Sequence, residues 1–314
     1  MEKIEALKIE VAKAVVGQTK MIDGLLIGLL TGGHILIEGV PGLAKTTTVN
    51  ALAKALGLNF KRAQFTPDLL PADIIGAEIY DPHENSFKIK HGPIFTNLLL
   101  ADEINRAPAK VQSALLEVMQ EKQVTIGDET FKLDLPFFVM ATQNPVEQEG
   151  VYQLPEAQLD RFMLKLVVGY NTKEEELEIA RRIASDVKSD VQTVISLEDL
   201  QTMKQDVLNI HMDEEIEKYI VDIIEATRAP EDFGLSNLSH YLQFGASPRA
   251  TIDLFRASRA MAYLRGKDYV SPVDVAYIVK DILRHRIILS YEAEAEDITA
   301  DFIIDAITKQ IPIP

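Results

Sequence analysis

A glycine-rich segment of eight residues offers the clearest chemistry in this chain: Gly39-Val40-Pro41-Gly42-Leu43-Ala44-Lys45-Thr46. It follows the apolar run Ile35-Leu36-Ile37 and precedes a helix-like stretch that begins at residue 47. A strand, a tight turn and a Lys-Thr pair at a helix start direct backbone N–H groups and the positive helix end towards phosphates. Lys45 would reach the outer phosphates, and the Thr46 hydroxyl would bind Mg²⁺. The segment therefore predicts a polyphosphate site, although Ala44 stands where the general pattern has glycine.

Two adjacent carboxylates, Asp102 and Glu103, follow the apolar run Leu98-Leu99-Leu100-Ala101. A carboxylate at the end of a buried strand near a phosphate loop can hold Mg²⁺, often through water. A second carboxylate beside it can orient the attacking water. Asp102 would be the metal residue and Glu103 the base. A strand that ends in two solvated acids is the alternative.

Three further polar residues stand where they could act on a phosphate. Asn144 ends the run Ala141-Thr142-Gln143-Asn144-Pro145, where an amide could hydrogen-bond the water or the γ-phosphate; a turn formed by Asn-Pro is the alternative. Arg161 precedes the last predicted strand, and Arg249 opens a helix of the second domain. A guanidinium directed at the γ-phosphate would stabilise its charge, although a lone arginine more often forms a surface ion pair.

Short apolar runs separated by helical stretches predict an α/β first domain with a buried, mainly parallel sheet flanked by helices. The runs lie at residues 34–38, 98–100, 137–140 and 164–168, and two helices are expected at residues 4–16 and 20–30. Residues 77–94 and 123–133 have the alternation and turns of two inserted hairpins. Helical patterns dominate afterwards, at residues 173–184, 213–227, 247–263 and 271–286. We therefore expect an α/β domain over residues 1–188 and a helical domain over residues 189–314.

Composition excludes several kinds of chemistry. The 314 residues carry a net charge of −16, which disfavours passive coating of nucleic acid or anionic membrane. The absence of cysteine excludes disulfides, thiolate metal sites and cysteine nucleophiles. The six histidines have no metal-ligand spacing. No signal peptide is visible, and the longest apolar stretch is far shorter than the roughly 20 residues of a membrane span, so a cytoplasmic protein without a transmembrane segment is expected.

Taken together, the motifs resemble those of the MoxR group of AAA+ ATPases. The resemblance rests on the phosphate loop, on Asp102-Glu103-Ile104-Asn105-Arg106, on residues 141–145, 154–162 and 245–249, and extends through residues 64–71 and 281–286. It covers nearly the whole chain. Ala44 is similar to this group's own version of the loop. The resemblance implies an AAA+ P-loop core followed by a C-terminal helical lid domain.

The resemblance also implies a role for each matching residue. Lys45 and Thr46 match the Walker A pair, Asp102 and Glu103 the Walker B pair, and Asn144 sensor 1. Arg161 matches the arginine finger, which acts on a neighbouring subunit in a ring, commonly a hexamer, and Arg249 matches sensor 2. The implied catalytic residues are Lys45, Glu103, Asn144, Arg161 and Arg249. The implied ATP-binding residues are Val16, Gly17, Gly39, Val40, Pro41, Gly42, Leu43, Ala44, Lys45, Thr46, Thr47, Asp102 and Arg249, with Thr46 and Asp102 holding Mg²⁺.

Four functions remain possible at this point. The resemblance favours an ATP-driven ring that remodels, matures or activates client proteins, including metalloenzymes, with a von Willebrand factor A domain protein as adaptor. A nucleic-acid motor is the second, although the hairpins offer only Lys88, Lys90, His91 and Lys132 as basic residues. A magnesium-chelatase-type motor subunit is a close relative of the first function. A scaffold that binds ATP without turnover is the fourth, and the presence of Glu103 and Arg161 argues against it.

Overall fold

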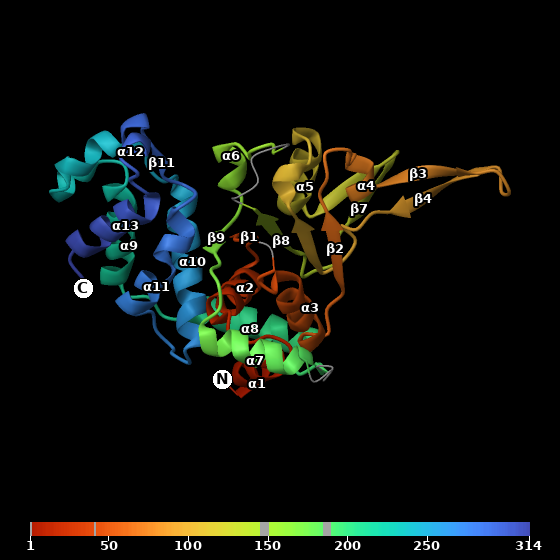
Figure 1. The fold of residues 1–314 in the computed structure, drawn as a ribbon, viewed down its shortest axis with the longest axis horizontal. Helices are drawn as coiled ribbons and strands as arrows, with labels where there is room; N and C mark the ends of the chain where they lie inside the picture. Colours follow the sequence, from red (N-terminus) through yellow and green to blue (C-terminus); the bar gives the residue numbers. More distant parts are fainter. Residues whose placement is uncertain (1, 41, 145–150, 185–189) are drawn as a thin grey trace. The chain divides into compact units, whose positions relative to one another are not determined.

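The computed structural model describes residues 2–40, 42–144, 151–184 and 190–314. The chain forms two compact units (Figure 1). The first contains Met1–Arg161 and Leu166–Leu200, and the second contains Phe162–Lys165 and Gln201–Pro314. The predicted boundary between residues 188 and 189 stays a prediction. No helix in the described ranges is long and apolar enough to cross a membrane.

A five-stranded sheet forms the centre of the first unit, in the order β2-β5-β8-β1-β9. These strands are β1 (Ile35–Glu38), β2 (Phe60–Gln64), β5 (Leu98–Asp102), β8 (Phe138–Gln143) and β9 (Leu164–Val167). The pairs β2 with β5, β5 with β8 and β8 with β1 are parallel. Residues 35–37 and 98–101 have no exposed side-chain surface, because helices cover both faces of a parallel sheet. The predicted fold class is confirmed.

The helices of the first unit are α1 (Glu2–Ala12), α2 (Thr19–Thr31), α3 (Lys45–Ala55), α4 (Pro71–Ile75), α5 (Ala109–Glu121), α6 (Glu156–Leu159) and α7 (Lys173–Ala184). A short 3₁₀ helix, η1 (Ile104–Arg106), follows β5. Helix α2 packs on β1, and α3 packs on β5 and α1. The phosphate loop therefore lies between a buried strand and a helix that packs against the sheet.

Strand β2 has no counterpart among the predicted apolar runs. Its sequence, Phe-Lys-Arg-Ala-Gln, leaves three of its five side chains exposed, and only Ala63 is buried. The strand lies at the edge of the sheet, where polar and charged side chains protect the open edge from pairing with another chain. An edge strand with such a composition has no apolar periodicity to reveal it.

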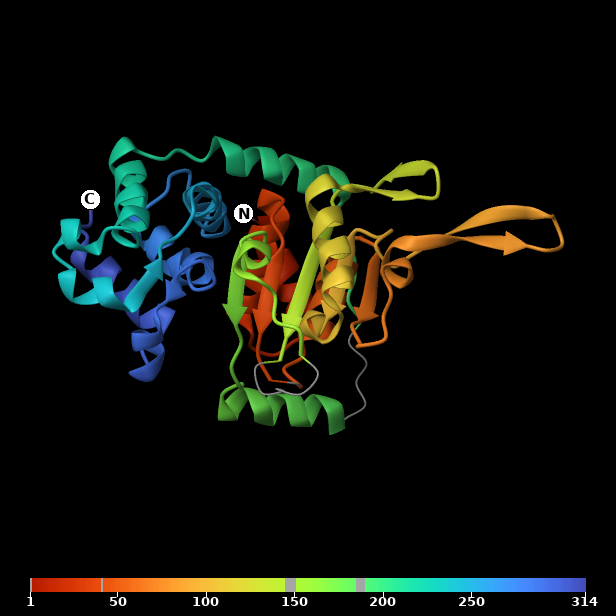
Figure 2. The same cartoon turned by 90° about the horizontal axis from the view of Figure 1, so that it is seen from above.

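Two hairpins interrupt the α/β order, as the sequence predicts. The first pairs β3 (Gly76–Asp81) with β4 (Ser86–His91), and the second pairs β6 (Gln123–Ile126) with β7 (Glu129–Lys132). Figure 2 shows both extending from the same side of the first unit. The ring centroids of His91 and Phe131 lie 5.3 Å apart, so the bases of the two hairpins are in contact.

The second unit is mainly helical. The helix α8 (Leu197–Asn209) begins in the first unit and continues into the second. It is followed by α9 (Glu214–Ala226), η2 (Pro230–Phe233), η3 (Ser236–Tyr241), α10 (Pro248–Leu264), α11 (Pro272–Leu283), α12 (Tyr291–Ala295) and α13 (Ala300–Gln310). A small antiparallel pair, β10 (Leu242–Phe244) with β11 (Ile288–Leu289), is the addition to the predicted helices. Helix α10 packs against α9 and α11, and α11 packs against α13.

Candidate active site

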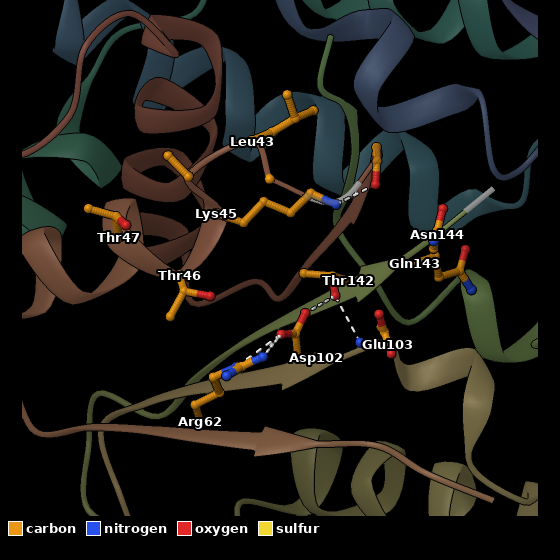
Figure 3. Close-up of a pocket in the computed structure, with 13 residues that line it drawn as sticks. Leu43, Lys45, Thr46, Thr47, Arg62, Asp102, Glu103, Thr142, Gln143 and Asn144 are labelled. Atoms are coloured by element: carbon orange, nitrogen blue, oxygen red, sulfur yellow. Dashed lines mark hydrogen bonds and ion pairs between the residues drawn. The ribbon is translucent and has the colours of Figure 1, made fainter. Parts of the chain in front are cut away.

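A cavity of about 420 Å³ lies at the carboxyl ends of β1, β5 and β8 (Figure 3). Because β8 separates β1 from β5, the cavity is bordered by the phosphate loop, by the polar end of β8 and by the two carboxylates after β5. The lining residues are Gly39, Gly42, Leu43, Ala44, Lys45, Thr46, Thr47, Arg62, Asp102, Glu103, Thr142, Gln143 and Asn144. Ligands of α/β proteins bind at this edge of the sheet, beyond the carboxyl ends of the strands.

The backbone of the phosphate loop makes its helix available to an anion. Gly42 has a φ of 88° and Ala44 a φ of 54°, both in the left-handed region. Ala44 is the residue just before α3, and its own side chain makes no capping hydrogen bond to that helix. An uncapped helix start combines unpaired N–H donors with the positive end of the helix dipole. This loop geometry is suited to a polyphosphate, and the nucleotide-binding role of its residues stays a prediction.

The Lys45 ammonium lies inside this loop, where it donates to the Gly39 carbonyl oxygen at 2.5 Å. Burial lowers the pKa of Lys45, and the negative charges of Asp102, Glu103 and Glu38 oppose that shift. The ammonium therefore lies between the loop and the acidic end of β5. A cation in this place can pair with the outer phosphates of a nucleotide.

Thr142 connects the carboxylate of Asp102, the last residue of β5, with the backbone of Glu103. Its hydroxyl donates to Asp102 Oδ1 at 2.6 Å and accepts from the Glu103 N–H at 2.9 Å. Thr142 is almost fully buried, and Figure 3 shows it between Asp102 and Glu103. Glu103 has a left-handed φ of 57°, which turns the chain sharply after the strand. The hydroxyl thus fixes both the Asp102 side chain and the backbone that carries the Glu103 side chain.

Two residues of β2 that were not predicted as site residues also hold these carboxylates. Arg62 Nη2 and Nε donate to Asp102 Oδ2 at 2.6 and 2.9 Å. Gln64 Nε2 donates to Glu103 Oε2 at 2.7 Å, and Arg106 Nη1 donates to the same oxygen at 3.2 Å. Arg62 and Gln64 are two residues apart, so they lie on one face of the strand. That spacing is one sequence signal that could have indicated them, and Gln64 also begins the motif at residues 64–71 that belongs to the family resemblance.

The predicted polar residue after β8 is also at the cavity. Asn144 is 8% exposed and lines the cavity together with Gln143. Strand β8 is hydrogen-bonded to β5, so Asn144 ends the strand beside the two carboxylates. The predicted Pro41, and Pro145 of the same motif as Asn144, lie outside the described residues.

Five predicted site residues within the described ranges do not line this cavity, and one of them is Val40 of the phosphate loop. Val16 and Gly17 lie between α1 and α2, where the Val16 carbonyl accepts from Asn171 Nδ2 at 3.0 Å. Arg161 is exposed at the end of the segment after α6. Arg249 is exposed in the first turn of α10, in the second unit. The roles predicted for these five residues stay predictions.

The donors in the cavity suit Mg²⁺. They are the Thr46 hydroxyl and the Asp102 carboxylate, and oxygen is the ligand that Mg²⁺ prefers. Within the described ranges, no three His, Asp or Glu side chains gather as a complete metal site.

Comparisons with known proteins agree with this geometry. The family model "ATPase family associated with various cellular activities (AAA)" matches residues 34–164, and the AAA lid domain model matches residues 236–307. Chaperone MoxR1 of Mycobacterium tuberculosis is 47% identical, over 99% of this chain and 82% of its own. Protein MoxR of Methylorubrum extorquens is 30% identical, over 97% of this chain and 93% of its own. A Cytophaga hutchinsonii protein with a solved crystal structure is 54% identical in sequence to this chain. The two structures match with a TM-score of 0.95, over 100% of this chain and 95% of that protein's chain.

Proposed function

Because this chain belongs to the MoxR family of AAA+ ATPases, we propose that it hydrolyses ATP with Mg²⁺ in the cavity beyond β1, β5 and β8. One observation carries the proposal: Lys45, the pair Asp102-Glu103 and Asn144, which come from three separate stretches of the sequence, line a single cavity. Phosphoryl transfer depends mainly on positioning and on electrostatic stabilisation, and these four residues supply both.

Each residue has a distinct task in this proposal. Lys45 and the N–H groups at the start of α3 bind the phosphates. Thr46 and Asp102 would hold Mg²⁺, which would neutralise phosphate charge when bound. Glu103 orients the attacking water and accepts its proton, and Asn144 donates a hydrogen bond to that water or to the γ-phosphate. Gln64 and Thr142 keep Glu103 in place through its side chain and its backbone, respectively.

We further propose that catalysis is completed between subunits of a ring, with a hexamer as the expected size. Arg161 does not line the cavity of its own chain and is exposed, which supports a role on a neighbouring subunit. Arg249 would reach the nucleotide as the sensor 2 residue. A guanidinium that stabilises the γ-phosphate in the transition state is worth about 10³- to 10⁵-fold in rate.

The proposed client is another protein. The hairpin of β3 and β4 carries exposed apolar side chains, including Tyr80 at 48% and Phe87 at 68% exposure. Exposed aromatic side chains on a protruding element are suited to contact a polypeptide. We propose that ATP turnover drives remodelling, maturation or activation of such clients, with metalloenzymes among them and a von Willebrand factor A domain protein as partner.

Two variants test the ATPase assignment. Glu103→Gln removes the base, and Arg161→Ala removes the finger. Each variant should still bind ATP, but its rate of ATP turnover should be at least about 10²-fold lower than that of the wild type. Mixed assemblies should regain part of the turnover, because the Glu103→Gln subunits supply fingers to the intact sites of the Arg161→Ala subunits. Wild-type turnover by Glu103→Gln would refute the assignment of the base. Wild-type turnover by Arg161→Ala would refute the finger.

A further inference from the structure

The chain crosses between the two units next to Arg161. It leaves the first unit after Arg161, contributes Phe162–Lys165 to the second unit, and returns to the first at Leu166. Three of these four residues are almost fully buried, with Phe162 and Leu164 at 0% and Met163 at 3% exposure. The peptide bond that follows Arg161 therefore leads into a buried segment, whose last two residues, Leu164 and Lys165, also begin strand β9.

Three consecutive residues of the second unit hold this crossing segment by its carbonyl groups. His285 Nε2 and Arg286 Nη2 both donate to the Phe162 carbonyl oxygen, each at 2.9 Å. Arg284 Nη1 donates to the Lys165 carbonyl oxygen, also at 2.9 Å. The segment Arg284-His285-Arg286, which we call the clamp, thus forms hydrogen bonds with both ends of the crossing segment.

Acidic side chains of the same unit fix the clamp in turn. The Arg286 side chain is 1% exposed and pairs with Asp253 of α10 at 2.6 Å. The Arg284 side chain is 7% exposed and pairs with Asp281 at 2.7 Å and with Asp301 at 2.9 Å. Buried guanidinium groups with several partners have few alternative positions. The clamp is therefore tied to α10, to α11 and to Asp301 in the first turn of α13.

His285 is held in one protonation state. Burial, and after it the positive charge of Arg286, keep the pKa of His285 well below its ordinary value. A neutral imidazole next to a carbonyl oxygen donates through the protonated nitrogen that faces it, which is Nε2. The contact with Phe162 is thus a permanent hydrogen bond, because the ring does not titrate around neutral pH.

We propose that the clamp is a positioning device for Arg161: it makes the placement of this arginine follow the second unit of its own chain. This inference rests on the proposed finger role of Arg161. Arg161 is bonded to Phe162, so any movement of the second unit that carries Phe162 also carries the arginine. A helical unit that responds to its own nucleotide would thereby adjust the catalytic rate of the neighbouring subunit.

Two clamp variants test the proposal in the assembled protein. His285→Leu removes one donor to Phe162 without leaving a buried charge unpaired. Arg286→Lys retains a cation for Asp253 but removes Nη2, the nitrogen that contacts both Asp253 and the Phe162 carbonyl oxygen. Each variant should lower kcat about 10- to 100-fold, because a displacement of about 1 Å has such an effect on a catalytic group. The KM for ATP should stay within about 3-fold, because the clamp does not bind the substrate of its own site.

Rescue and control variants separate positioning from a general structural defect. His285→Gln retains an N–H donor at the position of Nε2 and should recover most of the lost turnover. Arg265→Lys changes an ion pair of the same unit, between Arg265 and the buried Asp274, without touching the crossing segment. It should turn over ATP at the wild-type rate.

Two further readouts depend on the finger itself. Mixing His285→Leu with Glu103→Gln subunits should restore turnover, because intact fingers then reach intact sites. The double variant Arg161→Ala/His285→Leu should be no slower than Arg161→Ala alone, since a clamp cannot position an absent arginine.

The contrary results distinguish the inference from the function on which it rests. Wild-type turnover by Arg161→Ala would overturn the finger role and the clamp with it. Loss of turnover by Arg161→Ala, together with wild-type turnover by both clamp variants, would overturn the clamp alone. Failure of both clamp variants to assemble while Arg265→Lys assembles, or additive losses in the double variant, would show that these contacts are only structural.

Discussion

Asp102 divides its two carboxylate oxygens between neighbours on either side of β5. Oδ1 accepts from Thr142 of β8, and Oδ2 accepts from Arg62 of β2. Only Oδ2 therefore has a charged partner, and Arg62 is itself 48% exposed at the side chain. A cation that binds Asp102 meets the positive charge of this guanidinium at short range.

Replacing Arg62 should consequently change the magnesium requirement. In Arg62→Gln, the concentration of Mg²⁺ that gives half-maximal ATP turnover should fall about 2- to 10-fold, because a repelling charge beside Asp102 is removed. The free energy of unfolding should change by less than about 1 kcal/mol, as is usual for exposed ion pairs. Magnesium titrations at saturating ATP would measure the effect.

The matched control is Lys218→Gln, which breaks the exposed ion pair of Lys218 with Glu214 in α9. It should leave the magnesium requirement unchanged. A higher requirement in Arg62→Gln than in the wild type would show that Arg62 supports the metal site by orienting Asp102, and that repulsion is the weaker effect.

The site residues differ in how visible they are in the sequence. Lys45, Asp102 and Asn144 each follow an apolar run that ends at the same edge of the sheet, so strand patterns alone bring them together. Arg62 and Gln64 belong to a strand without such a run, and their role depends on its pairing with β5. Long-range pairing of a polar edge strand cannot be inferred from local periodicity.

At the scale of elements, buried strands and amphipathic helices are predictable for the same reason. Strands β1, β5 and β8 are apolar up to their polar carboxyl ends because both faces are covered, and α7 and α11 have the spacing of a helix with one packed face. The hairpins are visible because a turn separates two alternating runs. The crossing of residues 162–165 into the second unit has no local signal, because it depends on tertiary contacts with distant residues.

One buried histidine joins three elements of the first unit. His34, just before β1, accepts from the Val139 N–H of β8 through Nδ1 and donates through Nε2 to the Met119 carbonyl oxygen of α5, both at 3.0 Å. Burial lowers the pKa of His34 from 6.5 to about 4. A lowered pKa means that the folded protein binds this proton less readily than the unfolded chain. The stability contributed by neutral His34 is present above pH 6.5 and is lost as the pH falls from 6.5 to 4.

We therefore expect acid to destabilise the protein partly through His34. Between pH 7.5 and pH 5 the loss attributable to this residue should be about 2 kcal/mol. Urea unfolding, followed by circular dichroism at both pH values, would give the free energy of unfolding of the wild type and of His34→Gln. That free energy should fall less between the two pH values in the variant than in the wild type. His211→Asn, at an exposed histidine, is the control and should behave as the wild type. An equal loss in all three proteins would contradict the assignment.

At the scale of the whole molecule, charge bears on the choice between a protein client and a nucleic acid. The chain carries 48 acidic and 32 basic residues. The protruding hairpins share this excess, with Glu78, Asp81 and Glu84 against Lys88 and Lys90 in the first. Lys88 is also paired with Asp81 at 2.7 Å and with Glu84 at 2.6 Å. A phosphate backbone would have to displace these carboxylates.

DNA should therefore not stimulate ATP turnover. Single- and double-stranded DNA added at about 50 mM salt, where electrostatic binding is strong, should change the rate by less than about 2-fold. Lys90→Glu and Lys132→Glu, which make the hairpins more acidic, should leave the rate of ATP turnover with DNA unchanged. Phe87→Ser, in contrast, should weaken any stimulation of ATP turnover by an unfolded protein. Strong stimulation by DNA that falls steeply with salt, and that both lysine variants abolish, would identify the chain as a nucleic-acid motor. The weakness of that alternative thus depends on the charges of the hairpins, because the ATP site is compatible with either kind of work.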